Sequence, residues 1–310
     1  MQRSDVTRED GTWLGLSLEA EGRREPGLCV FTAGRRLVIA QQSRPVLLAL
    51  VDRHLQGVDF WRTDEYRSVA PPLRADTARA LAGSPVRWAR RFAEYLGEAA
   101  GGPLHDGRWL LSFESPLLRW RHAGTSHAAY WEEMLVEGHP DGYLDWHLHS
   151  CGWEVLALRP VPDAADSRVK AYRKQARDGT LPPVLLWWVS GLDCHVILDG
   201  HARLAAAVAE DIEPPLLHLH RTTPRDDLDA GTAEAVALYE DELARFARLR
   251  ETHGPTVPDG TATAGPQLAR RLHDLTVWEQ PTWAWPLPGG EEAWQRVAEG
   301  VTGGRSWPRG

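Results

Sequence analysis

The chain has 310 residues, of which 43% are hydrophobic and 25% charged, and it carries a formal net charge of −8 with a pI near 5.9. This composition is typical of a folded protein long enough for one large domain or two ordinary ones. Because the acidic balance would repel a phosphate backbone, specific DNA binding is not expected.

The apolar stretches and the cysteines indicate a cytoplasmic protein. The run at 182–189 is far shorter than the ~20 residues that a membrane-spanning helix needs, so no membrane partner is expected. The first eleven residues lack the apolar core of a secretory signal. The three cysteines, Cys29, Cys151 and Cys194, have no CxxC spacing, which argues against a zinc site and a disulfide framework.

Residues 1–150 are predicted to form an α+β region that we assign to no family. Short apolar runs separated by turn formers indicate strands, and longer stretches with helical periodicity indicate helices. The predicted elements are strands at 28–32 and 37–40, a helix at 46–56, helical residues 76–96 with a restart at Ser84-Pro85, and a hairpin with arms at 109–113 and 117–121.

Residues 151–222 are predicted to form a separate α/β domain, followed by a helical extension with a Gly/Pro linker at 223–310. Strands that alternate with helices bring the loops at strand ends together. The domain's predicted elements are strands at 153–158, 183–189, 195–198 and 214–219 and helices at 167–177 and 201–210. In the extension we expect helices at 229–250, 267–275 and 291–297 and a linker at 255–266.

The turn from Asp199 to Arg203 carries the clearest chemical signal in the chain. Gly200 lets the backbone bend sharply between a strand and a helix, and the first amides of that helix would stabilise an anion. Arg203 can form paired hydrogen bonds with phosphate oxygens, and His201 can exchange a proton near neutral pH. Asp199 could hold Mg²⁺ or act in catalysis, although an Asp-Gly pair is also a common structural turn. The predicted cofactor-binding residues are therefore Gly200, His201, Ala202 and Arg203.

The stretch from Trp153 to Leu219 resembles the ParB/sulfiredoxin superfamily, through a Pro-Pro strand, a hairpin and the Asp-Gly-His-Ala-Arg turn. The turn is similar to the Asp-Gly-His-His-Arg of the superfamily's free serine kinases, with Ala202 in place of the second histidine. The resemblance implies a nucleotide-binding protein that uses ATP, ADP or CTP with Mg²⁺ and phosphorylates a small, amino-acid-like substrate. The kinases place a glutamate base after the first strand, where this chain offers Asp163 and Asp166.

The alternative function is a non-catalytic, nucleotide-sensing or protein-binding regulator related to ParB. The many tryptophans outside the turn favour interaction surfaces, including a homodimer interface. Sulfiredoxin chemistry is excluded at this turn because His201, and not a cysteine, precedes Arg203 in the motif.

Two histidine pairs are further candidates. His147 and His149 would share one face of a strand, near His139, and could bind a metal, but no third ligand has a recognised spacing. His218 and His220 have the same spacing at the end of the last predicted strand, and we expect them on an exposed face or at the rim of the nucleotide site.

Overall fold

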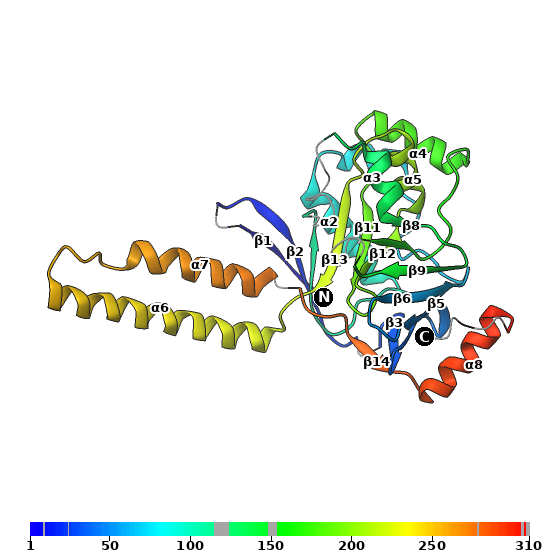
Figure 1. Ribbon diagram of the computed structural model, residues 1–310. Helices are drawn as coiled ribbons and strands as arrows, with labels where there is room; N and C mark the ends of the chain where they lie inside the picture. Colours follow the sequence, from blue (N-terminus) through cyan, green and yellow to red (C-terminus); the bar gives the residue numbers. More distant parts are fainter. Residues whose placement is uncertain are drawn as a thin grey trace.

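The protein is a mixed α/β structure with two mixed sheets (Figure 1). The computed structural model describes residues 1–8, 10–23, 25–114, 124–147, 154–277, 279–304 and 307. The predicted hairpin arm at 117–121, together with Cys151 and Trp153, lies outside the described residues. None of the helices in the described part is both long enough and apolar enough to cross a bilayer.

The first sheet has six strands in the order β14-β3-β4-β5-β6-β9. Neighbours from β3 to β9 run antiparallel, whereas β14 lies parallel to β3. The strands are β3 (Leu28–Ala33), β4 (Arg36–Gln41), β5 (Arg44–Val51), β6 (Gly57–Arg62), β9 (Asp141–Asp145) and β14 (Ala284–Pro286).

The helix predicted at 46–56 is wrong, because residues 44–51 form strand β5. Residues 46–50 are all apolar because both faces of the strand are buried there. Leu47 and Ala49 pack into the main core, whereas Leu48 and Leu50 pack against Trp294 of helix α8 (Gly290–Thr302). A strand covered on both sides loses the alternation that distinguishes it from a buried helix.

The second sheet has eight strands in the order β1-β2-β7-β13-β11-β12-β10-β8. It joins the first 150 residues to the predicted middle domain, since β13 pairs antiparallel with β7 and places His218 opposite Ser112. The strands are β1 (Gln2–Thr7), β2 (Trp13–Ala20), β7 (Gly107–Ser112), β8 (Leu135–Val136), β10 (Val155–Ala157), β11 (Val184–Val189), β12 (Cys194–Asp199) and β13 (Leu216–Arg221).

The elements predicted for the middle segment are present. Helix α4 (Ser167–Arg177) has the predicted bounds, and its cap is Asp166, whose carboxylate accepts hydrogen bonds from the amides of Arg168 and Val169. Strand β11 is central and lies between β13, to which it is parallel, and β12, to which it is antiparallel. Helix α5 (His201–Ala209) follows β12 directly.

The remaining helices are α1 (Ala75–Leu81), α2 (Pro85–Glu98), α3 (His127–Met134), α6 (Arg225–His253) and α7 (Thr261–Val277). The predicted restart at Ser84 is confirmed, because Ser84 is the N-cap residue of α2. Helices α6 and α7 form a long hairpin that projects from the body of the protein (Figure 1). The linker predicted at 255–266 is shorter than expected, since α7 begins at Thr261 and includes Pro266.

Candidate functional site

The predicted turn joins strand β12 to helix α5 through a residue that has to be glycine. Gly200 has a φ of +107°, and a Cβ there would lie 3.0 Å from Cα of Val184 and 2.8 Å from Nη2 of Arg203. As the N-cap residue of α5, Gly200 offers no side chain to the first amides of the helix. The Arg203 amide donates to the Gly200 carbonyl at 2.8 Å, so the amides of His201 and Ala202 keep hydrogen-bonding capacity for a ligand.

The Asp199 carboxylate is held on both oxygens by other side chains. Its Oδ2 lies 2.6 Å from Nη2 of Arg203 in an ion pair whose side chains are only 10% and 4% exposed. Its Oδ1 accepts a hydrogen bond of 2.6 Å from the Ser68 hydroxyl. Arg203 also donates to the Pro183 carbonyl at 2.9 Å, so it ties the turn to the start of β11.

This arrangement does not fit the Mg²⁺ ligand predicted for Asp199. Both carboxylate oxygens already have a partner, and the described residues contain no group of three His, Cys, Asp or Glu side chains that could hold a metal. A Mg²⁺ ion requires several oxygen ligands in near-octahedral geometry.

A cavity of about 420 Å³ opens beside the turn and is rich in basic groups. Arg159, which follows β10, and Arg168 in the first turn of α4 both line it, as do Gly200, His201 and Arg203. Among the described residues, neither Arg159 nor Arg168 pairs its guanidinium with a carboxylate. The cavity thus combines two uncompensated cations with the amino-terminal end of α5.

His201 is completely buried at this cavity, and neither of its ring nitrogens has a hydrogen-bond partner in the described structure. Burial lowers its pKa well below the usual value, and the nearby charges of Arg159, Arg203 and Arg62 lower it further. The imidazole is therefore neutral at neutral pH. A buried imidazole without such a partner is unusual, because buried polar groups in native proteins nearly always have one.

The loop after β6 completes the site from the N-terminal region. The Tyr66 hydroxyl donates to the Leu198 carbonyl at 2.6 Å, and Ser68, Pro71 and Pro72 line the cavity. These contacts span more than one hundred residues of sequence, so no local motif could have identified them.

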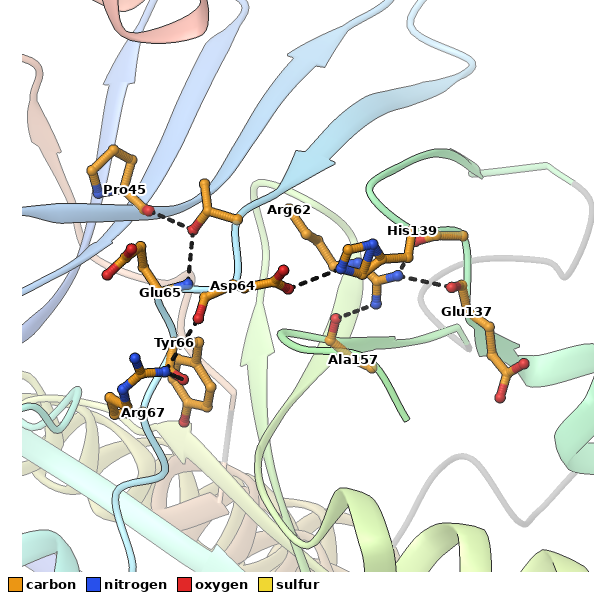
Figure 2. Close-up of polar contacts among 11 residues, drawn as sticks. Pro45, Arg62, Asp64, Glu65, Tyr66, Arg67, Glu137, His139 and Ala157 are labelled. Carbon is orange, nitrogen blue, oxygen red and sulfur yellow. Dashed lines mark hydrogen bonds and ion pairs between the residues drawn. The ribbon is translucent and has the colours of Figure 1, made fainter. Parts of the chain in front are cut away.

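Figure 2 shows how the start of this loop is anchored. The buried Arg62 donates to the Ala157 carbonyl at 2.7 Å and to the Glu137 carbonyl at 2.8 Å, and this links β6 to the ends of β10 and β8. Asp64 pairs with His139 at 2.9 Å. Burial lowers the Arg62 pKa to about 10, so its charge persists at neutral pH and adds to the positive potential around His201.

Two other hollows in the described structure are larger than the cavity beside the turn. A hollow of about 590 Å³ lies beside Asp64 and His139, and one of about 560 Å³ lies between α6 and α7. The first contains Arg44, which is already paired with Glu65, and the second is lined by both acidic and basic residues. The cavity at the turn differs because two arginines without a carboxylate partner among the described residues lie there beside the amino-terminal end of α5.

The two candidate bases do not face the cavity. Asp166 is the exposed cap of α4, and its Oδ1 accepts from the Arg168 amide at 2.7 Å. Asp163 is exposed in the preceding loop, where it accepts a hydrogen bond from the Ala165 amide at 2.6 Å. Both carboxylates therefore organise the entry to α4, and neither lines the cavity.

The histidine pairs do not form a metal site among the described residues. His147 lies in a turn after β9, its predicted partner His149 lies outside the described residues, and His139 pairs with Asp64. The exposed position expected for His218 is wrong: it is 3% exposed and packs edge-to-face with His195, with 4.9 Å between the ring centroids. Strand β13 is covered there because it is an interior strand of the sheet.

A pH dependence of stability follows from the neutral His201. A histidine whose pKa is lower in the folded state stabilises the fold above its unfolded pKa of about 6.5, and this stabilisation is lost as the pH falls. Wild type should lose up to ~2 kcal/mol more free energy of unfolding than His201→Asn between pH 6.5 and 5, at ~1.4 kcal/mol per pH unit. Urea titrations of both proteins at the two pH values measure this difference.

A partly buried glutamate, Glu154, acts in the opposite direction and cancels in that comparison. Burial raises the pKa of Glu154 to about 7, so its contribution to stability increases as the pH falls below 7. Equal pH slopes in wild type and His201→Asn would show that His201 is not held neutral.

No family model, no curated protein and no solved structure matches this chain. The resemblance of residues 153–219 to the ParB/sulfiredoxin superfamily therefore stays a prediction.

Proposed function

We propose that the cavity beside the turn binds the phosphate groups of a nucleotide. The observation that carries this proposal is the convergence of Arg159 and Arg168, neither of which pairs with a carboxylate among the described residues, with the uncapped amides at the start of α5. Each of these groups alone is ordinary. Together they favour an anion with several acceptor oxygens, and phosphate is the common biological ligand of that kind.

The rest of the cavity suits a nucleotide better than free phosphate. Its volume of about 420 Å³ lies in the range of small-molecule sites, ~300–1,000 Å³, and is far larger than one phosphate group requires. Pro71, Pro72 and the ring of Tyr172 also line it and offer apolar surface for a nucleoside. ATP, ADP and CTP are the candidate ligands, and the cavity geometry does not choose among their bases.

We favour a nucleotide-binding regulator over a kinase for a free small molecule. A kinase of that kind needs a carboxylate that can accept the proton of a substrate hydroxyl. Asp199 is the one carboxylate among the described residues that line the cavity, and it is occupied by Arg203 and Ser68. A substrate hydroxyl would have to displace Ser68 first.

Isothermal titration calorimetry of the purified protein with ATP, ADP, CTP and inorganic tripolyphosphate tests the proposal. We expect at least one nucleotide to bind in the micromolar range and tripolyphosphate to compete with it, because the phosphates provide most of the contacts. Chromatography of the nucleotide after incubation with a mixture of amino acids should show no consumption that depends on the amino acids. If none of the four ligands binds, the proposal is contradicted. If nucleotide is consumed only when amino acids are present, the protein is a kinase and not a regulator.

A further inference from the structure

The Ser68 hydroxyl has the surroundings of a phosphate acceptor. Its Oγ donates to Oδ1 of Asp199 at 2.6 Å, within the 2.6–3.2 Å range that a general base requires. Ser68 lines the same cavity as Arg159, Arg168 and the amino-terminal end of α5. The residue is only partly buried and sits in a loop without regular secondary structure, so its side chain has room to accept a group.

We propose that Ser68 is a self-phosphorylation site, which receives the terminal phosphoryl group of a nucleoside triphosphate held in this cavity. The inference rests on the proposed nucleotide-binding function and adds a reaction to it. The acceptor is then part of the chain, and no small-molecule substrate is needed.

The proposed step is a single displacement at the terminal phosphorus. Ser68 Oγ forms a bond to that phosphorus, the bond from the phosphorus to the oxygen bridging the β and γ phosphates breaks, and the nucleoside diphosphate leaves with the bond's electron pair. The hydroxyl proton passes to Oδ1 of Asp199. The guanidiniums of Arg159 and Arg168 and the α5 amides would stabilise the charge on the transferring group.

The role of Asp199 is consistent with its second contact. The ion pair with Arg203 fixes the carboxylate in place and leaves Oδ1 to the serine. A general base has to be held in the correct position relative to the hydroxyl, because a displacement of about 1 Å greatly lowers the rate of the reaction. The Asp199–Arg203 pair, buried at the end of β12, supplies that rigidity.

The phosphoserine formed at residue 68 would remain in the cavity beside the turn. A phosphoserine carries about −1.5 to −2 charges at neutral pH and three acceptor oxygens. Held on Ser68, these oxygens would lie in the same cavity as Arg159, Arg168 and the free amides, and would occupy groups that otherwise bind the nucleotide. The phosphorylated protein should therefore bind ATP at least roughly tenfold more weakly than the unmodified protein.

The competing interpretation gives Ser68 a purely structural role, in which its hydroxyl orients Asp199 and stabilises the loop. The loop geometry allows this, because the hydroxyl also lies 3.2 Å from the Ala70 carbonyl. The two interpretations differ in one observable, which is a covalent phosphate on residue 68.

The test uses the full-length protein and ATP supplied as its magnesium salt. Wild type is incubated with γ-³²P-labelled ATP, digested and mapped by tandem mass spectrometry, and α-³²P-labelled ATP serves as a control for non-covalent binding. We expect the γ label on Ser68, no label in Ser68→Ala, and label on the hydroxyl at position 68 in Ser68→Thr. Ser4→Ala, at an exposed serine on β1, should retain full labelling.

Parallel calorimetry with ATP separates the possible failures. Circular dichroism checks that Ser68→Ala is folded, and ATP binding is measured on wild type. If wild type binds ATP without label at residue 68, or is labelled elsewhere, the inference is overturned and the proposed binding function stands. If ATP does not bind at all, both the self-phosphorylation of Ser68 and the proposed binding function are contradicted. Because site mapping is done on wild type, a folding defect in a variant cannot decide the result.

Discussion

Replacing Gly200 with alanine is expected to lower the free energy of unfolding by about 3 kcal/mol and to abolish nucleotide binding. A non-glycine residue at a φ of +107° costs ~1–3 kcal/mol in backbone strain alone. The new Cβ would also lie 3.0 Å from Cα of Val184, which belongs to the backbone of the central strand and cannot move alone. Relief of this contact would rotate the first turn of α5 and displace the amides that face the cavity.

Gly179→Ala is the matched control for this prediction. Gly179 also has a positive φ, +66°, but a Cβ there would meet nothing within 4 Å. Gly179→Ala should therefore lower the free energy of unfolding by about 1 kcal/mol, because it introduces backbone strain but no steric clash. Urea unfolding followed by tryptophan fluorescence measures both variants. If the two substitutions destabilise equally, the close approach of β11 to the turn is not a constraint.

Removing Arg159 and Arg168 together is expected to weaken ATP binding about 100-fold. Each charge-assisted hydrogen bond contributes ~1.5–3 kcal/mol, and so at least tenfold in affinity. The fold should be unaffected, because neither guanidinium pairs with a carboxylate among the described residues. Calorimetry of Arg159→Ala, Arg168→Ala and the double variant measures the losses, which we expect to add because each cation contacts the ligand separately.

Arg177→Ala provides the control, since it removes a cation of the same helix on another side. Arg177 is 54% exposed in its side chain and pairs with Glu210 at 2.7 Å, away from the cavity. ATP affinity should be unchanged in this variant. A double variant that keeps wild-type affinity, or a loss as large in Arg177→Ala, would show that binding depends on general charge and not on this cavity.

The sequence predicted the parts of the site that depend on local interactions. Helix α4 has the predicted bounds because its cap Asp166 and its stop at Asp178-Gly179 lie next to it in the chain. The turn at Gly200 was predicted for the same reason, since a strand, a glycine and a helix in succession allow few conformations. Strand β5 was mistaken for a helix because its pattern depends on α8, which packs on it from more than two hundred residues away.

The partners of the turn could not be predicted, because they come from distant segments. The sequence predicts a role for Asp199, but its contact with Ser68 joins residues that are 131 positions apart. Arg62, whose positive charge lowers the pKa of His201, lies on β6 in the six-stranded sheet, whereas Asp199 ends β12 in the eight-stranded sheet. Only the folded chain shows that Arg203 holds Asp199, whereas Arg159 and Arg168 at the same cavity pair with no carboxylate among the described residues.

A crystal structure of the protein grown with ATP tests the central claim most directly. We predict phosphate oxygens within hydrogen-bonding distance of the His201 and Ala202 amides and of at least one of Arg159 and Arg168. Nucleotide density at another place on the protein, with this cavity filled by water or by rearranged side chains, would contradict the account.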